Sequence, residues 1–380
     1  MRSSISSSEP DRYARQTASD RPGVAQPVPL RPVPIQPWGW MLVGATVLFA
    51  LFLGLWEGYW RWYGVTPSIA NTQGLWAIQR RRIDAGEGDA TVLLGASRLY
   101  FDIQLPVWER LSGRRPIQLS FEGTAPLSAL EDLAEDPKFT GRLVIGVAPD
   151  VFFSGRAYRA GAARYAHKES PSQRIGQWLS MRLIEPYLAF DDPDYALQTV
   201  LARQPWPSRM PERLAVRKLA QSEADRNTHL WSKVETDPYR ALARSVWLNH
   251  LQPSDSDRPE QEARKIEKEQ IDRTAKAVAK LQARGVKVLF VRLPSTGPYL
   301  EFENRKYPRA RTWEALLTSS HAPGIYFEDY PQLQGYELPE WSHIQHADAE
   351  RFTAALYLII ERDFWRPAAP ATHAESKSTP

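Results

Sequence analysis

Three residues of this chain have side chains that suit the making or breaking of an ester bond: Ser97, Glu340 and His343. Ser97 follows the apolar run Thr91–Leu94, and His343 lies three residues after Glu340. A serine is a weak nucleophile until a base removes its proton, and a histidine base needs a third group that fixes its orientation. We therefore expect a hydrolase or acyltransferase with Ser97 as nucleophile, His343 as base and Glu340 as orienting acid. His346 is the competing base, but it has no acid at the preceding third position.

Ser97 also has a purely structural interpretation, because serine commonly caps a helix or occupies a turn. Two arginines are further candidates: Arg98, next to the nucleophile, and Arg292, at the end of an apolar run. Their guanidinium groups suit substrate binding through an anionic sugar or an acyl carboxylate, and Arg309 is a weaker candidate of the same kind. A structural salt bridge is the alternative for each arginine.

Composition narrows the classes of function. The chain has 380 residues, of which 43% are apolar, and a formal net charge of +4. It is long enough for one large domain with insertions or for two smaller ones, and its interspersed charges argue against a nucleic-acid partner. The absence of cysteine excludes disulfides and thiolate chemistry. His343 and His346 have no third ligand at a suitable spacing, so we expect neither a metal nor another cofactor.

The elements that must position these side chains follow from an alternation of short apolar runs and helix-like stretches after about residue 89. This alternation is typical of an α/β domain with a parallel sheet. Ser97 would then lie at the carboxyl end of the first strand, where such sheets keep their chemistry. The predicted strands are 90–94, 116–119, 142–147, 286–291 and 324–327, and the predicted helices are 128–135, 260–284 and 347–362.

Residues 154–257 interrupt the alternation. They are rich in arginine, tryptophan, proline and glutamine, and 175–188 and 240–251 are amphipathic. We expect a helical insertion between two halves of the sheet. A cap over the active site and a packed peripheral subdomain are equally compatible with this pattern.

The uncharged stretch Trp38–Trp56 has about the length that a helix needs to cross a bilayer, and tryptophans and tyrosines flank it. We expect a transmembrane helix; a cleaved signal peptide and a buried helix are the weaker alternatives. Arginines concentrate before the stretch, which places the N-terminus in the cytoplasm and the main domain, 57–366, in the periplasm or outside. The proline-rich segment 1–37 and the segment 367–380 are expected to be disordered tails.

Three sequence blocks carry a resemblance to a known superfamily. Gly-Ala-Ser-Arg at 95–98, Gln-Leu-Ser-Phe-Glu-Gly-Thr at 118–124 and Glu-Trp-Ser-His at 340–343 resemble the blocks of SGNH (GDSL-like) hydrolases. The similarity is to membrane-anchored bacterial members related to polysaccharide O-acetylation proteins, and covers roughly 88–153 and 285–362. It implies a flavodoxin-like three-layer sandwich with a parallel sheet. It also implies that the backbone N–H groups of Ser97 and Gly123 bind the oxyanion.

Two positions depart from the superfamily pattern. Pro149 occupies the asparagine position of the Gly-x-Asn-Asp block, and proline has no N–H to offer an oxyanion. Loss of one such donor lowers a rate by about 10²–10³. Asp150, which follows it, is expected to be a loop or cap residue. Glu340 replaces the usual aspartate and can still accept the histidine N–H.

The resemblance implies a membrane-anchored, exported serine esterase or O-acyltransferase in the bacterial inner membrane. Its expected substrate is an O-acyl group, acetyl above all, on a cell-envelope polysaccharide or another acylated small molecule. The alternative is a catalytically impaired protein that binds glycan or docks a membrane-bound acyltransferase. Pro149 and Glu340 favour that alternative, and a close Ser97, His343 and Glu340 set would favour the enzyme.

Overall fold

A computed structural model of the chain describes residues 36–204, 218–253 and 258–365. The chain divides into two compact units, Met1–Leu55 and Trp56–Pro380, and each is described here by itself. Both predicted tails lie outside the described residues, except for residues 36 and 37.

The described part of the first unit is the start of a long helix, α1 (Trp38–Tyr63). It is the one helix among the described residues that is long and apolar enough to cross a membrane, with a mean hydropathy of 1.9. The helix begins where the apolar stretch begins and continues beyond Trp56 to Tyr63, so that its last turns belong to the second unit.

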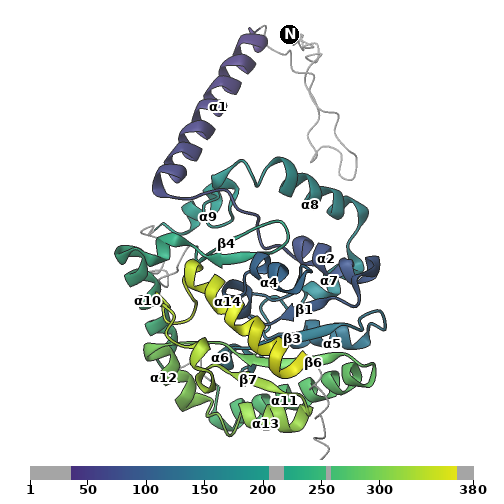
Figure 1. Cartoon of the computed structure of the whole chain (residues 1–380). Coiled ribbons are helices and arrows are strands. Elements are labelled where there is room, and N and C mark those ends of the chain that lie inside the picture. The colour runs from purple at the N-terminus through teal and green to yellow at the C-terminus, as the bar shows by residue number, and fades with distance from the viewer. Residues whose placement is uncertain (1–35, 205–217, 254–257, 366–380) are drawn as a thin grey trace, which may run out of the picture. The chain divides into compact units, whose positions relative to one another are not determined.

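The second unit contains a five-stranded sheet in which every strand is parallel to its neighbours (Figure 1). The strand order is β2-β1-β3-β6-β7. The central strands are apolar along almost their whole length and buried, as expected for a parallel sheet covered on both faces. The predicted α/β class with a parallel sheet is therefore confirmed. The strands are β1 (Thr91–Leu94), β2 (Ile117–Gln118), β3 (Arg142–Val147), β6 (Lys287–Arg292) and β7 (Gly324–Tyr326).

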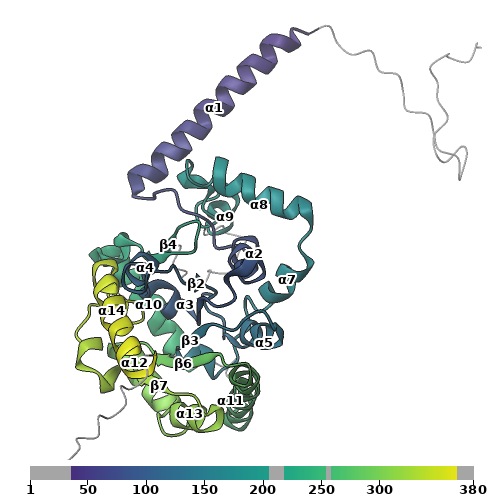
Figure 2. The same cartoon turned by 45° about the vertical axis from the view of Figure 1, so that its right-hand side comes forward.

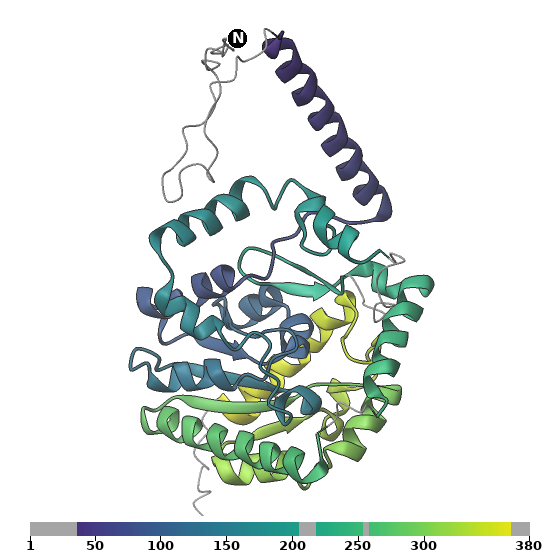
Figure 3. The ribbon, with the colours of Figure 1, turned by 180° about the vertical axis from the view of Figure 1, so that it is seen from behind.

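Helices cover both faces of this sheet. In Figure 1, α14 (His346–Ile360) crosses in front of the sheet, near α4 (Leu105–Ser112). Figure 3 shows the opposite face, covered by α5 (Leu127–Glu135) and α11 (Glu260–Ala283), and α13 (Trp313–Ser320) packs on α11. The apolar residues of α14 at helical spacing are buried in the main core, as the sequence predicts. The shorter helices are α2 (Gln73–Arg82), α3 (Ser97–Asp102), α6 (Pro149–Phe152) and α12 (Gly297–Lys306).

The segment 154–257 is only partly helical. Its helices are α7 (Ala162–Lys168), α8 (Pro171–Leu183), α9 (Leu197–Ala202) and α10 (Asp237–Leu251), and α7 and α8 pack beside α2 (Figure 2). The segment also holds an antiparallel pair, β4 (Ala220–Ser222) and β5 (Thr228–Leu230), which the prediction of a helical insertion missed. These strands are too short and too polar to show an alternating pattern. The segment has its own apolar core, which includes Tyr195 and Trp231 and is completed by Trp60 from α1.

Candidate active site

The sheet presents Ser97 at its carboxyl edge. β1 ends at Leu94, and α3 begins at Ser97 after only two residues. Two glycines permit this sharp entry: a Cβ at Gly146 would lie 2.7 Å from the Cβ of Leu99, and one at Gly95 would lie 3.0 Å from it. The chain leaves β1 toward β2 on one side and returns to β3 on the other, so Ser97 lies at the switch point where open α/β sheets bind ligands.

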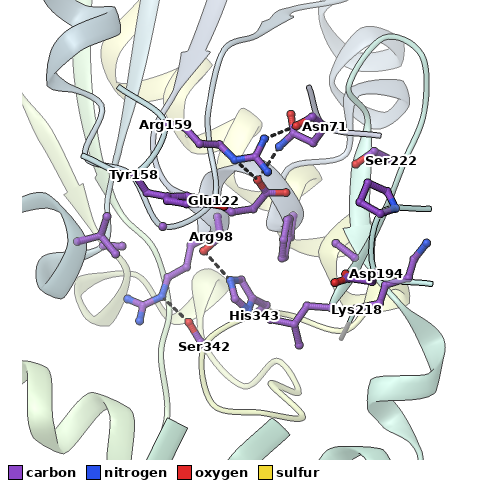
Figure 4. A pocket seen from close by; sticks show the side chains of 18 of the residues that line it. Asn71, Arg98, Glu122, Tyr158, Arg159, Asp194, Lys218, Ser222, Ser342 and His343 are labelled. Atoms are coloured by element: carbon purple, nitrogen blue, oxygen red, sulfur yellow. Dashed lines mark hydrogen bonds and ion pairs between the residues drawn. The ribbon is translucent and has the colours of Figure 1, made fainter. Parts of the chain in front are cut away.

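The predicted serine, histidine and glutamate meet in one chain of hydrogen bonds, which we call the serine network (Ser97, His343, Glu340). His343 Nε2 lies 2.8 Å from Ser97 Oγ, and His343 Nδ1 lies 2.8 Å from Glu340 Oε1 (Figure 4 labels His343). His343 and Glu340 are buried. The carboxylate therefore holds the proton on Nδ1 and leaves Nε2 free to accept the serine proton.

Neighbouring groups fix the orientation of Glu340 and His343. Glu340 Oε1 also accepts the backbone N–H of His343 at 2.7 Å, and Oε2 accepts the indole N–H of Trp247. Phe101 packs on the imidazole with ring centroids 4.6 Å apart. Trp247 lies on α10, in the segment 154–257, and was not predicted as a site residue. No signal near Glu340 in the sequence points to it, because the two residues lie 93 positions apart.

The two backbone amides predicted to bind an oxyanion both belong to residues that line the cavity. Ser97 N–H belongs to the first turn of α3, and Gly123, which has φ +56°, borders the same cavity. Neither amide donates a hydrogen bond to any residue in 36–204, 218–253 or 258–365. Pro149 begins α6 and carries no N–H, so the third donor position of the SGNH pattern lacks a backbone or asparagine donor.

Asp150, which the sequence predicts to be a loop or cap residue, also lines the cavity. It lies in the first turn of α6, is buried, and accepts the Tyr299 hydroxyl proton at 2.7 Å. Burial opposes its ionisation, but hydrogen bonding to His250 and Tyr299 and the positive charge of Arg98 outweigh this effect, so the Asp150 pKa lies below its ordinary value. The carboxylate therefore borders the cavity as an anion.

Arg226, in the turn between β4 and β5, binds the backbone of the loop that leads to Gly123. Arg226 is fully buried, donates from Nε to the carbonyl oxygen of Gln118 at 3.1 Å, and donates from Nη2 to that of Ser120. Its guanidinium lies 4.7 Å from the centre of the Tyr100 ring. Burial lowers the Arg226 pKa. The segment 154–257 thus positions a predicted oxyanion donor as well as the acid.

A cavity of about 540 Å³ opens in front of Ser97. The sheet edge and the segment 154–257 both contribute to its wall, so that segment covers the site and has a packed core of its own. Across the cavity, Asn71 Nδ2 donates to Glu122 at 2.5 Å and Arg159 pairs with the same carboxylate (Figure 4). Further polar lining residues from the segment are Arg156, Tyr158, Asp194 and Ser222.

The two arginines proposed for substrate binding instead belong to a second cluster, the arginine network (Arg98, Arg292, Glu303). Arg98 Nη1 lies 2.9 Å from Glu303 Oε1, and Arg292 Nη2 lies 2.8 Å from Oε2. All three side chains are 1% exposed. Arg98 also borders the cavity and donates to the Ser342 hydroxyl at 3.2 Å, whereas Arg292 is not among the residues that line the cavity. The salt-bridge alternative fits both residues better.

The two remaining candidates lie outside the cavity wall. Arg309 forms a surface ion pair with Asp329 at 2.6 Å. His346 begins α14, and its ring stacks on that of His229 with centroids 3.8 Å apart. Burial and the neighbouring His229 lower the His346 pKa. Geometry therefore selects His343 as the base.

Comparison with known proteins gives no family: no family model matches the sequence, and no curated protein matches it. Among the described residues, no group of three or more histidine and acidic side chains has the arrangement of a metal site. The function of this chain must therefore be inferred from its own residues.

Proposed function

We propose that this chain is a membrane-anchored, exported serine esterase or O-acyltransferase, and that its domain is SGNH-like. The observation that carries the proposal is the serine network, which ends at a hydroxyl on the wall of a cavity. The strand order supports the fold assignment, because β2-β1-β3-β6-β7 matches the order 2-1-3-4-5 of flavodoxin-like sheets.

The geometry supports the following reaction. Ser97 Oγ attacks the ester carbonyl carbon while its proton passes to His343 Nε2, and Glu340 stabilises the resulting imidazolium. The N–H groups of Ser97 and Gly123 bind the negative oxygen. The imidazolium then gives its proton to the leaving alcohol, and an acyl group remains on Ser97. Water or a sugar hydroxyl then gives its proton to His343 and attacks the acyl carbon. The bond from that carbon to Ser97 Oγ breaks, and His343 returns the proton to Oγ.

The cavity supports an acylated carbohydrate as substrate. Its wall carries carboxylate, guanidinium, amide and hydroxyl groups, which pair with sugar hydroxyls, and the exposed ring of Tyr158 offers an apolar surface. We propose acetyl groups on a cell-envelope polysaccharide as the reacting groups. In this proposal α1 spans the bacterial inner membrane with its N-terminus in the cytoplasm and the domain in the periplasm.

Pro149 favours the second candidate, a protein that binds glycan or docks a membrane acyltransferase without turnover. It leaves the site with two amide donors, and one missing donor costs about 10²–10³ in rate. The aligned serine, histidine and glutamate support catalysis instead, because a binding protein gains nothing from a buried acid that orients a base. We therefore propose a slow enzyme.

The test is the hydrolysis of an aryl acetate by the full-length chain in detergent, compared with Ser97→Ala and His343→Ala. Ser97 is the first residue of α3 and Ala96 is its N-cap, so alanine at 97 removes no capping side chain. Ser319→Ala, at an exposed serine, is the matched control. Turnover lost in both site variants and kept in the control supports the esterase. Equal turnover in all four proteins would reject it and favour the binding protein.

A further inference from the structure

The outer side of α8 is apolar and exposed. Four large side chains at helical spacing share this side, and no residue in the described part of the chain buries them. Figure 2 shows α8 at the edge of the domain. Exposed apolar surface of this kind marks an interaction site in a folded protein. The four residues and their exposed fractions are Ile175 (59%), Trp178 (54%), Leu179 (40%) and Leu183 (62%).

The opposite side of α8 is docked on the domain. Gln177 accepts a hydrogen bond from the Thr72 hydroxyl at 2.6 Å, and Met181 packs in a small apolar core with Ile69 and Leu75. A full capping box with Ser170 starts the helix. The apolar side is therefore held outward by a formed helix with a fixed orientation.

The residues that follow α8 are bound to the end of α1. Glu57, next to the predicted span, accepts the backbone N–H groups of Ala189 and Phe190 at 2.9 and 3.1 Å. Arg61 donates from Nη2 to the carbonyl oxygen of Tyr187 at 2.8 Å. All these residues belong to the second unit. These contacts join the segment after α8 to the last turns of α1.

Charge identifies the occupant of this apolar side. Arg182 lies between Trp178 and Leu179 around the helix, is exposed, and forms no ion pair with any residue in the described ranges. A cation inside an apolar stripe suits lipid, because its stem lies along the acyl chains while its head reaches the phosphates. Exposed Tyr187 is an aromatic side chain of the type found at membrane interfaces.

We propose that α8 lies flat in a membrane interface, with its apolar side among the acyl chains and Arg182 at the phosphates. This inference depends on the proposed membrane span of α1. Asp192, Pro193 and Asp194, shortly after α8, line the cavity. The contact would therefore bring one wall of the active site close to the lipid surface, where a membrane-borne substrate arrives.

Because the chain has no cysteine, single-cysteine variants carry one label each. The full-length protein is reconstituted into phosphatidylethanolamine and phosphatidylglycerol vesicles with an environment-sensitive fluorophore at Leu183→Cys, at Leu48→Cys in α1, or at Lys265→Cys, an exposed position on α11. Lipids with a nitroxide on the acyl chain serve as quenchers. We expect emission from the first two labels to fall about twofold, emission from the third to stay unchanged, and Arg182→Glu to weaken quenching at position 183.

The outcomes separate the two proposals. Quenching at position 48 without quenching at position 183 would overturn the contact of α8 and leave the span in place. No quenching at either position would reject the span, and the contact of α8 with it. A blue-shifted but unquenched label at position 183 would mean that protein, such as a second copy, covers α8, and would also overturn the proposal.

Discussion

The serine network and the arginine network are both buried, charged and assembled from distant parts of the chain, yet they end differently. The serine network stops at a hydroxyl on the wall of the cavity. In the arginine network, one carboxylate faces two guanidinium groups, and every member is 1% exposed. The serine network ends at a group that a substrate can reach, whereas Glu303 balances the charges of the arginine network, although Arg98 also borders the cavity.

This difference shows that position at a strand end does not by itself make a residue functional. Arg292 is the last residue of β6, as the functional interpretation requires, but Glu303 takes up its charge. Ser97 follows β1, and its only side-chain hydrogen bond within the described residues is to the candidate base. The two residues differ in whether they border the cavity: Ser97 lines it, and Arg292 does not.

The largest expected effect is on the serine network. Glu340→Gln keeps the shape of the side chain but removes the charge that holds the proton on His343 Nδ1, so kcat should fall about 10³–10⁴-fold with little change in thermal stability. Steady-state kinetics and a melting curve measure both quantities. Glu337→Gln, at an exposed position, is the control. Undiminished kcat in Glu340→Gln would show that the network is structural.

The arginine network should respond in stability. Glu303→Ala removes the carboxylate that two buried guanidinium groups share, which costs about 3–5 kcal/mol in the free energy of unfolding. Urea unfolding measures this loss against Glu301→Ala, an exposed position on the same helix, and Glu303→Gln is the fallback if the alanine variant does not fold. Equal stability of Glu303→Ala and Glu301→Ala would show that Glu303 does not stabilise the fold through the two buried arginines.

A smaller effect is expected where α10 supports the acid. Trp247→Phe removes the indole N–H that binds Glu340 Oε2 but keeps an aromatic ring. The carboxylate becomes less well oriented, and kcat should fall about tenfold, the size of one lost charge-assisted hydrogen bond. Leu248→Ala, partly exposed on the same helix, should leave kcat unchanged. Equal kcat values for Trp247→Phe and Leu248→Ala would show that α10 does not help to orient Glu340.

The smallest effect concerns Asp102, whose pKa is raised well above its ordinary value by burial, against the opposing effects of the Ile344 N–H and Arg98. Folded protein keeps this proton while unfolded protein loses it above pH about 4, so wild-type stability falls as pH rises until the folded group also ionises. Asp102→Asn cannot titrate. We compare the free energy of unfolding of Asp102→Asn with that of wild type. The difference between them should be constant below pH about 4 and should shift in favour of Asp102→Asn as the pH rises above that value.

Urea unfolding at several pH values measures this trend. Asp237→Asn, whose side chain is 94% exposed, should show no such trend. A constant difference between Asp102→Asn and wild type at every pH would mean that the buried carboxyl does not keep its proton in the folded protein.

Sequence patterns were sufficient where the structural cause is local. The strand predicted at 142–147 is β3 with the same bounds, and the helix predicted at 260–284 is α11, followed by Gly285 at φ +82°. A continuous apolar run and a glycine stop depend on neighbouring residues alone. The members of the serine network were predicted because their residue types and the strand-end rule identify them.

Sequence patterns failed where the cause is distant. Trp247 lies 93 positions from Glu340, and Arg226 lies 108 positions from Gln118. No pattern in the local sequence of α10 or of the β4–β5 turn predicts these contacts. For Arg98 and Arg292 the sequence left substrate binding and a salt bridge open, because their partner, Glu303, lies on α12, which the patterns did not predict.

The proposed reaction requires Ser97 to be an activated nucleophile. The most direct test treats the full-length chain with a fluorophosphonate, whose phosphorus reacts with such a serine and loses fluoride, and locates the adduct by mass spectrometry of peptides. We predict one adduct, on Ser97, that is lost in His343→Ala and kept in Ser319→Ala. An unmodified Ser97, or labelling that persists in His343→Ala, would contradict the proposal that His343 activates Ser97.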